Sequence, residues 1–245
     1  MFNAFTDPAP DRWGRNLLAR RERKSAQAEK RQPRTLLDID YLTLVEDKNR
    51  LGALCFADTG SEEFLATSDQ PVPPLVNLGR LLSAATRIVD DKESDDDLKL
   101  LLAPGASLGG ARPKAAVLDS DGKLMIAKFP SPTDDWPVPR WETVAMDLAR
   151  AAGINVPPSR LLTVVKRPIF VMSRFDRNEQ GQRIPFISAL TALGAADGDT
   201  RSYIELVDII REDGALPESD AAETWRRMVF NILISNTDDH LRNHV

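Results

Sequence analysis

The sequence predicts an α+β fold in which a small antiparallel sheet is followed by helices. Two apolar hairpin patterns, over residues 115–129 and 160–175, are separated by one amphipathic helix pattern over 141–153. Helical periodicity then continues to the end of the chain. With 245 residues, of which 42% are hydrophobic and 28% charged, the chain has the composition of a globular protein with one large or two small domains.

Before the hairpins, the sequence predicts a helix-rich region. Trp13, Leu17 and Leu18 indicate a short amphipathic helix that runs into a mobile connector near residues 24–34. The further elements expected here are a helix over 36–45, a short strand over 51–56 and a helix with a buried face over 75–89. The stretch DDKESDDD, residues 90–97, contains no apolar residue and predicts a linker. We therefore expect three parts, which are residues 1–97, 98–190 and 191–245.

Turn and cap signals support the elements that follow. Asp121 and Gly122 can supply the positive φ of a hairpin turn, and Gly153 and Pro157 are placed to end the helix over 141–153. The face of this helix predicted to be buried consists of Trp141, Val144, Ala145, Leu148, Ala149 and Ala152.

Two more helices are expected near residues 200–212 and 221–235. The second opens with the capping-box spacing of Asp220 and Glu223. Its predicted buried face consists of Trp225, Met228, Val229, Ile232 and Leu233.

Charge is distributed unevenly along the chain. Residues 12–34 contain nine Lys and Arg against Glu22 and Glu29, a local charge of +7, so the net charge of −5 leaves −12 elsewhere. Such a stretch could contact nucleic acid or an acidic partner, or form a solvated helix whose arginine stems cover apolar surface. We favour the second interpretation, because no aromatic interleaving or groove-reading motif accompanies the charge.

Cysteine and hydropathy patterns indicate the compartment. The single cysteine, Cys55, excludes an internal disulfide and favours a reducing cytoplasm. No apolar run approaches the ~18 residues that a membrane helix needs, and the N-terminus lacks the apolar core of a signal peptide. We expect a cytoplasmic protein that does not contact a membrane.

The first candidate site is a glycine-containing loop, APGASLGGARPKAAV over residues 103–117. Gly109 and Gly110 let a backbone approach a ligand closely, and amides in such loops suit phosphate, although a plain flexible loop has the same composition. Lys128 ends the next strand on the same side as the apolar Leu124 and Ile126, where a charge indicates an anionic contact. Glu142, at the first turn of the following helix, could be a surface residue that interacts with the helix dipole or the partner of that lysine. In this order, the three features are typical of the nucleotide clamp of protein-kinase-like enzymes.

The last residues, NTDDHLRN over 236–243, hold the second candidate site. Asp238 and Asn243 are separated by five positions, as are the catalytic Asp and the metal-binding Asn of protein kinases. The Asn and Asp residues could also simply end the preceding helix. His240 and His244, four positions apart, could instead bind a metal in a hydrolase, but no glutamate lies between them and no third ligand is evident.

On these motifs, the sequence resembles the HipA-type serine/threonine kinases, the toxins of bacterial toxin–antitoxin modules. The matching motifs span nearly the whole chain and are PDRWGR (10–15), PRTLLDIDYL (33–42), RLGAL (50–54), SLGGARPKA (107–115), the Lys128 strand, the Glu142 helix ending in GINVP (153–157), SRFDR (173–177) and NTDDHLRN (236–243).

The resemblance implies a two-lobed protein-kinase-like fold, with ATP and Mg²⁺ bound between the 103–175 region and the helices after 190. It implies that Lys128 contacts the phosphates, Glu142 supports Lys128, and Asp238 is the catalytic base. Asn243 would be a Mg²⁺ ligand, and Ser107 would be autophosphorylated, which inactivates the kinase. The other implied nucleotide-binding residues are Ser107, Gly109, Gly110 and His240, together with Val171, Ser173 and Phe175 at a hinge that faces adenine.

The implied reaction is transfer of the ATP γ-phosphate to a Ser or Thr hydroxyl of a protein, an aminoacyl-tRNA synthetase in this family. A DNA-binding antitoxin is the implied partner, through which the protein would meet DNA indirectly. Family members carry a further metal-binding aspartate on a later strand and usually begin with a small β-subdomain. Neither is found between Met1 and Val245, so we expect a truncated chain. Two alternatives are a defective remnant that binds nucleotide or antitoxin, and a small-molecule kinase of the same fold.

Overall fold

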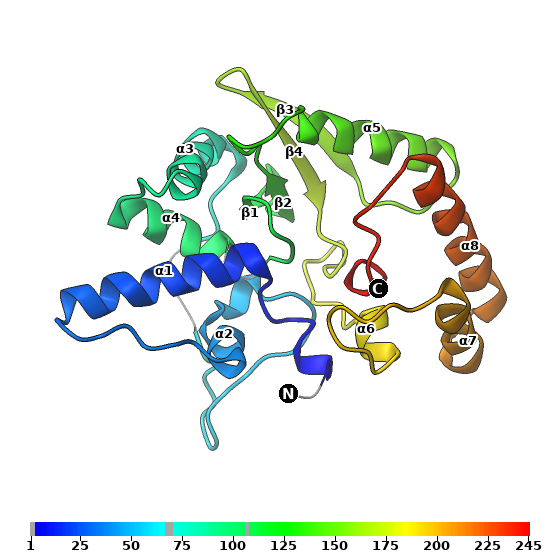
Figure 1. The fold of residues 1–245 in the computed structure, drawn as a ribbon, viewed down its shortest axis with the longest axis horizontal. Helices are drawn as coiled ribbons and strands as arrows, with labels where there is room; N and C mark the ends of the chain where they lie inside the picture. Colours follow the sequence, from blue (N-terminus) through cyan, green and yellow to red (C-terminus); the bar gives the residue numbers. More distant parts are fainter. Residues whose placement is uncertain (1–2, 67–70, 106–107) are drawn as a thin grey trace. The chain divides into compact units, whose positions relative to one another are not determined.

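A computed structural model describes residues 3–66, 71–105 and 108–245 (Figure 1). The chain divides into two compact units. Among the described residues, the first contains those within 8–143 and 157–185, and the second contains residues 3–7, 144–156 and 186–245. The predicted boundary at residue 97 therefore lies inside the first unit.

The first unit contains a four-stranded antiparallel sheet in the order β1-β2-β4-β3. Its strands are β1 (Lys114–Leu118), β2 (Leu124–Lys128), β3 (Ser159–Val164) and β4 (Arg167–Ser173). Both predicted hairpins are confirmed, since β1 pairs with β2 and β3 with β4. In the first hairpin turn only Gly122 of the predicted pair has a positive φ, of +77°. The structure thus places the end of β2, with Lys128, next to the central strand β4.

Helices pack against one face of this sheet (Figure 1). They are α1 (Arg12–Ala28), α3 (Leu78–Val89) and α4 (Asp95–Gly105), and shorter helices, α2 (Asp38–Leu44), η2 (Asp47–Asn49) and η3 (Leu75–Asn77), complete the N-terminal part. Trp13, Leu81 and Leu101 join Met125 and Ala127 of β2 in one cluster of buried apolar residues. Because neighbouring strand residues face opposite sides, this burial leaves Leu124, Ile126 and Lys128 on the other face, as predicted.

The acidic segment 90–97 is not a linker, because its last residues form the first turn of α4. Ser94 and Asp97 cap this helix reciprocally. The Asp97 amide donates to Ser94 Oγ over 3.2 Å, and the Ser94 amide donates to Asp97 Oδ2 over 2.9 Å. Asp97 is only 5% exposed, and it also accepts a hydrogen bond of 2.7 Å from Arg87 Nε of α3. The guanidinium of Arg87 holds the pKa of Asp97 well below its usual range, although burial opposes this shift.

Replacing Asp97 with Ala is expected to lower the free energy of unfolding by about 2 kcal/mol, since a helix cap and a charged hydrogen bond are lost together. A carboxylate whose pKa is lower in the folded than in the unfolded protein stabilises the fold at pH values above its unfolded pKa of about 3.9. This stabilisation is lost as the pH falls through the folded pKa. Urea unfolding at several pH values should therefore show the wild type and Asp97→Ala converging below about pH 4. Asp96→Ala, at the exposed neighbouring position, is the control and should change little. Equal losses in the two variants would contradict the assigned role of Asp97.

The basic segment is largely paired within the unit. Ion pairs join Lys24 of α1 to Asp95 and Arg20 to Glu93, each to the acidic segment that follows α3. In all, five of the nine basic residues in 12–34 form ion pairs, namely Arg15, Arg20, Lys24, Arg31 and Arg34. These contacts fit the solvated-helix interpretation. The helix α1 runs to Ala28, beyond the predicted start of a mobile connector near residue 24.

The predicted strand over 51–56 is wrong, because buried side chains bind the backbone at its beginning. Asp176 accepts a 2.8 Å hydrogen bond from the Gly52 amide, and Arg174 donates to the carbonyl of Arg50 over 3.1 Å. Arg174 and Asp176 also pair with one another, and both side chains are fully buried. This network binds the backbone of residues 49–52 to the segment after β4. It therefore uses backbone amide and carbonyl groups that would otherwise pair with a neighbouring strand.

The second unit is helical, with η1 (Asn3–Phe5), α6 (Ala189–Ala192), α7 (Tyr203–Asp213), α8 (Pro217–Leu233) and η4 (Leu241–Asn243). The reciprocal cap is found on α7, between Ser202 and Glu205. The predicted cap of α8 by Asp220 and Glu223 is wrong, since α8 already begins at Pro217, three residues earlier. Glu223 instead accepts a hydrogen bond from the Asn155 amide over 3.2 Å and pairs with Arg226 and Arg227.

The apolar faces of two helices differ from the prediction. On α5 (Val138–Ala151), which contributes to both units, Trp141 is 60% exposed and Leu148 is 51% exposed. On α8, Trp225 is 62% exposed and Leu233 is 76% exposed. The other predicted core residues found exposed on these helices are Val144, Ile232 and, just beyond α5, Ala152. Periodicity identified apolar stripes correctly but did not show whether other residues cover them.

Across the residues that the structure describes, no helix has both the length and the apolar character needed to cross a membrane.

Candidate functional site

Lys128 is placed by the register of the sheet. It is the last residue of β2 and lies opposite Phe170 of β4, whose ring centroid is 5.6 Å from Lys128 Nζ. The lysine side chain is 30% exposed, on the face that the helices of the core cluster do not cover. Its ammonium group therefore lies over an aromatic ring with access to solvent, where an anionic ligand can reach it.

Glu142 forms an ion pair with Lys128, as the sequence predicted. Both residues belong to the first unit, and the glutamate side chain is 26% exposed. Because α5 begins at Val138, Glu142 lies in its second turn and not in its first. This position weakens the explanation by the helix dipole, which acts mainly on the first turn, and favours a role as the partner of Lys128.

The glycine loop is bound to α1. The Gly110 amide donates to Asp11 Oδ2 over 2.8 Å, and Lys114 Nζ donates to the Gly109 carbonyl. Arg112, in the same loop, pairs with Asp134. The Gly110 amide thus donates its hydrogen bond to a carboxylate, whereas the sequence analysis expected the amides of this loop to contact phosphate. Ser107, the predicted autophosphorylation site, lies outside the described residues.

The predicted hinge residues, at the end of β4 and just after it, differ in orientation. The side chain of Val171 is fully buried in the core cluster. Ser173 Oγ lies 3.5 Å from the sulfur of Met125, and Phe175 is 39% exposed. The Ser173 amide donates to the Pro158 carbonyl over 2.8 Å.

Residues 236–243 form a turn that is held by its own hydrogen bonds. Asn243 Nδ2 donates to the Asp238 carbonyl over 2.6 Å, and the Asp238 amide donates to Asn236 Oδ1 over 3.1 Å. The carboxylate of Asp238 is 85% exposed and lies 3.6 Å from Nε2 of His240. The turn therefore presents the predicted catalytic base to solvent while tying its backbone to Asn243.

Asp239 is the centre of a cluster that the sequence reasoning missed. It accepts a 2.5 Å hydrogen bond from the hydroxyl of Tyr203, and its other oxygen lies 2.9 Å from Nε2 of His244. The rings of Tyr203 and His244 meet edge to face, with centroids 5.4 Å apart. Burial and the hydrogen bond to Asp239 raise the pKa of Tyr203 to about 12. A tyrosine at the start of α7 thus holds the residue next to Asp238.

The two histidines do not form a metal site. His240 lies near Asp238, whereas His244 pairs with Asp239. Among the described residues, His, Cys, Asp and Glu form no group of three or more that could hold a metal ion. The metal-hydrolase alternative therefore has no ligand set in the described part of the chain.

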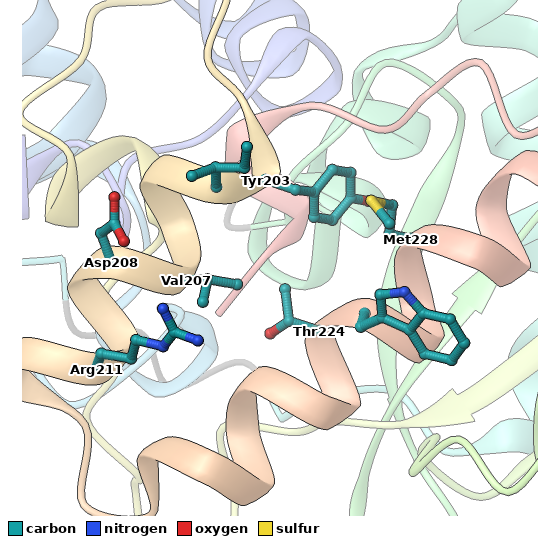
Figure 2. Close-up of a pocket in the computed structure, with 8 residues that line it drawn as sticks. Tyr203, Val207, Asp208, Arg211, Thr224 and Met228 are labelled. Carbon is teal, nitrogen blue, oxygen red and sulfur yellow. The ribbon is translucent and has the colours of Figure 1, made fainter.

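A surface hollow of about 270 Å³ lies between α7 and α8 (Figure 2). Tyr203, Val207 and Met228 give it an apolar lining, and Asp208 and Arg211 add charge from α7. It is lined by none of the residues predicted from the sequence to bind nucleotide.

Comparisons with known proteins agree with the kinase-like arrangement. A family model described as HipA-like C-terminal domain matches residues 106–245. The protein named "Putative kinase Y4mE" from Sinorhizobium fredii (strain NBRC 101917 / NGR234) is 26% identical over an alignment of 164 residues, and the match covers 56% of this chain and 37% of that protein.

A solved structure is similar over most of the chain. It is described as the Shewanella oneidensis MR-1 toxin antitoxin system HipA, HipB and its operator DNA complex. The match has a TM-score of 0.59 and 17% identity, and covers 93% of this chain and 60% of that chain. At this identity the likeness shows the fold alone, and it confirms the predicted α+β fold of the HipA kinase type. The chain spans less than two thirds of the length of both proteins, 37% of the first and 60% of the second.

Proposed function

The chain belongs to the family of the HipA-like C-terminal domain, and from this premise we propose that the protein is a HipA-type kinase that transfers the ATP γ-phosphate to a protein hydroxyl. The observation that carries the proposal is the ion pair between Lys128 and Glu142. It joins a strand lysine to a glutamate of the following helix, which is the arrangement that protein kinases use to hold nucleotide phosphates.

Lys128 is proposed to bind the phosphates, and Glu142 to orient it. A lysine ammonium group is a compact charge on a flexible stem, so its position depends on a partner. Glu142 supplies that partner from a helix, which is more rigid than a loop. The aromatic ring of Phe170 on the neighbouring strand further limits the positions that the lysine ammonium group can take.

Asp238 is proposed as the base that accepts the proton of the attacking hydroxyl. Its carboxylate is exposed and can meet a substrate, while its backbone is held by Asn236 and Asn243. Tyr203 and His244 hold the adjacent Asp239 and so limit movement of the turn. The rate would then depend on positioning and on charge stabilisation, without a covalent intermediate.

ATP and Mg²⁺ are the proposed cofactors. Asn243 donates a hydrogen bond through Nδ2, which directs its other amide atom, an oxygen, away from the Asp238 carbonyl. Amide and carboxylate oxygens are ligands that suit Mg²⁺, which usually keeps several waters and binds substrate phosphates. Asn243 would supply one amide oxygen, so waters and the phosphates of ATP would have to supply most of the other ligands of the ion. When bound, the ion neutralises phosphate charge.

The proposed partner is a DNA-binding antitoxin. The support is the similar structure, which is described as a complex of HipA with HipB and operator DNA. The proposed substrate is a Ser or Thr of a protein, an aminoacyl-tRNA synthetase by resemblance to the family, and the proposed location is the cytoplasm.

The full-length protein, incubated with γ-labelled ATP, Mg²⁺ and a protein extract, should transfer label to protein. Mass spectrometry should place the phosphate on Ser or Thr, and Ser107 of the protein itself is one proposed acceptor. Label in soluble small molecules alone would favour the small-molecule kinase. If the protein neither binds nor consumes ATP, the proposed function is wrong.

A further inference from the structure

The motif PDRWGR at residues 10–15 has no role in the proposed chemistry, yet it contacts the glycine loop directly. Asp11 is the N-cap of α1, and its Oδ1 accepts a 2.8 Å hydrogen bond from the Arg12 amide. Its second oxygen, Oδ2, accepts the 2.8 Å hydrogen bond from the Gly110 amide. One carboxylate thus fixes the start of a helix and a point in the loop.

The contact is reciprocal. Two residues after Asp11, the backbone amide of Trp13 donates to the carbonyl of Gly110 over 3.1 Å. Both backbone groups of Gly110 are therefore bound by the first turn of α1. Gly110 has a φ of +83°, a conformation that residues with a side chain rarely adopt, so the loop is held in a specific local geometry.

Trp13 also binds the end of the glycine loop at Lys114 and lies close to Gly105. Its indole Nε1 donates to the carbonyl of Lys114, the first residue of β1, over 2.9 Å in a buried position. At Gly105, the last residue of α4, a Cβ would lie 3.3 Å from the same Nε1 and 2.9 Å from Leu17 Cδ1. The missing side chain of Gly105 thus lets the end of α4 pack directly against α1. Trp13 itself is only 3% exposed.

We propose that Asp11 and Trp13 are positioning residues that anchor the glycine loop for nucleotide binding. The inference rests on the proposed kinase function. It assigns to the start of α1 the role of holding the loop on which ATP affinity depends. Phosphate would be bound by other amides of the loop, because the Gly110 amide is held by Asp11. A loop whose described residues 108–114 are held at Gly110 and Lys114 loses less conformational freedom when it binds a ligand, so the anchor is expected to favour binding.

Asp11→Asn is the sharpest variant. Asn is as good an N-cap as Asp, so its side-chain oxygen can still accept from the Arg12 amide. Its NH₂ group would then face the Gly110 amide, where two donors cannot pair. Because Asn has one acceptor oxygen for the amides of Arg12 and Gly110, the substitution breaks at least one of the two contacts, and hydrogen exchange at Gly110 reports whether it is the contact with the loop. Trp13→Phe is the second variant, since it keeps a buried ring and removes the indole donor.

Two measurements on the full-length protein test the anchor. Calorimetric titration with Mg·ATP should show weaker binding in each variant, by up to about tenfold, because the loop must then be ordered when the ligand binds. Hydrogen exchange without nucleotide should become faster in residues 108–114 of both variants. Asp97→Ala, which weakens α4 without touching the loop, is the control for general destabilisation and should bind ATP like the wild type.

The outcomes separate the two proposals. If the wild type binds ATP and Asp11→Asn binds it equally well, the anchor is wrong and the kinase proposal stands. Unchanged exchange in residues 108–114 of both variants also contradicts the anchor. If the wild type itself does not bind Mg·ATP, the proposed function fails and the inference fails with it. Tighter binding by Asp11→Asn would mean that Asp11 competes with phosphate, which also overturns the anchor.

Discussion

Asp238→Asn is expected to lower phosphate transfer by about three orders of magnitude, in line with the 10²–10⁴ contribution of a general base. Asparagine keeps the size of the side chain but cannot accept the proton of the attacking hydroxyl. The Asp238 carboxylate is 85% exposed, and the turn is held through the backbone of this residue. The melting temperature and the dissociation constant for Mg·ATP should therefore change little.

The matched control is Asp213→Asn, which replaces an exposed aspartate at the end of α7 in the same unit. This variant should transfer phosphate like the wild type. The readout is label incorporated from γ-labelled ATP per minute, with thermal melts for all three proteins. Substantial transfer by Asp238→Asn would remove this residue from the role of base.

Lys128→Met is expected to lower kcat/KM for ATP by at least about 100-fold, because a charge that stabilises the transferring phosphate is lost. Stability should change by only about 1 kcal/mol or less, as for other partly exposed ion pairs. Glu142→Gln leaves the lysine charge in place and removes only its partner. We expect a smaller loss of about tenfold, since Lys128 is then less well oriented.

The chain offers a control with a similarly exposed lysine in the ion pair between Lys24 and Asp95. The Lys24 side chain is 32% exposed, against 30% for Lys128, and both pairs belong to the first unit. Lys24→Met should cost similar stability and leave phosphate transfer unchanged. If Lys24→Met and Lys128→Met lose activity equally, the Lys128 pair serves the fold and not the reaction.

The ion pair between Lys128 and Glu142 could be predicted because it depends on local patterns. Strand alternation gives the face on which Lys128 lies, and the next element along the chain supplies Glu142. The helix α4 could also have been predicted from its start. Ser94 and Asp97 have capping-box spacing before an apolar run, but the acidic composition of 90–97 obscured this signal.

Other errors arose from contacts that are distant in the sequence. Asp176 binds the Gly52 amide across 124 positions, and this contact replaces the predicted strand. Tyr203 reaches Asp239 across 36 positions, so the hydrogen bond that holds the turn has no local signature. The anchoring of Gly110 by Asp11 spans 99 positions. Hydrophobic periodicity shows which side of a helix is apolar, but burial depends on distant segments, as the exposed Trp141 and Trp225 illustrate.

The central claim is that Lys128 lies at the phosphates of a bound nucleotide. An acyl-phosphate derivative of ATP, which transfers its acyl group to a nearby lysine amine, tests this placement directly by mass spectrometry of the labelled peptides. The account predicts labelling of Lys128 in the full-length protein, loss of this label with excess Mg·ATP, and stronger labelling of Lys128 than of the similarly exposed Lys24. Labelling of Lys128 that excess ATP does not reduce, or ATP-protected labelling of another lysine alone, would contradict it.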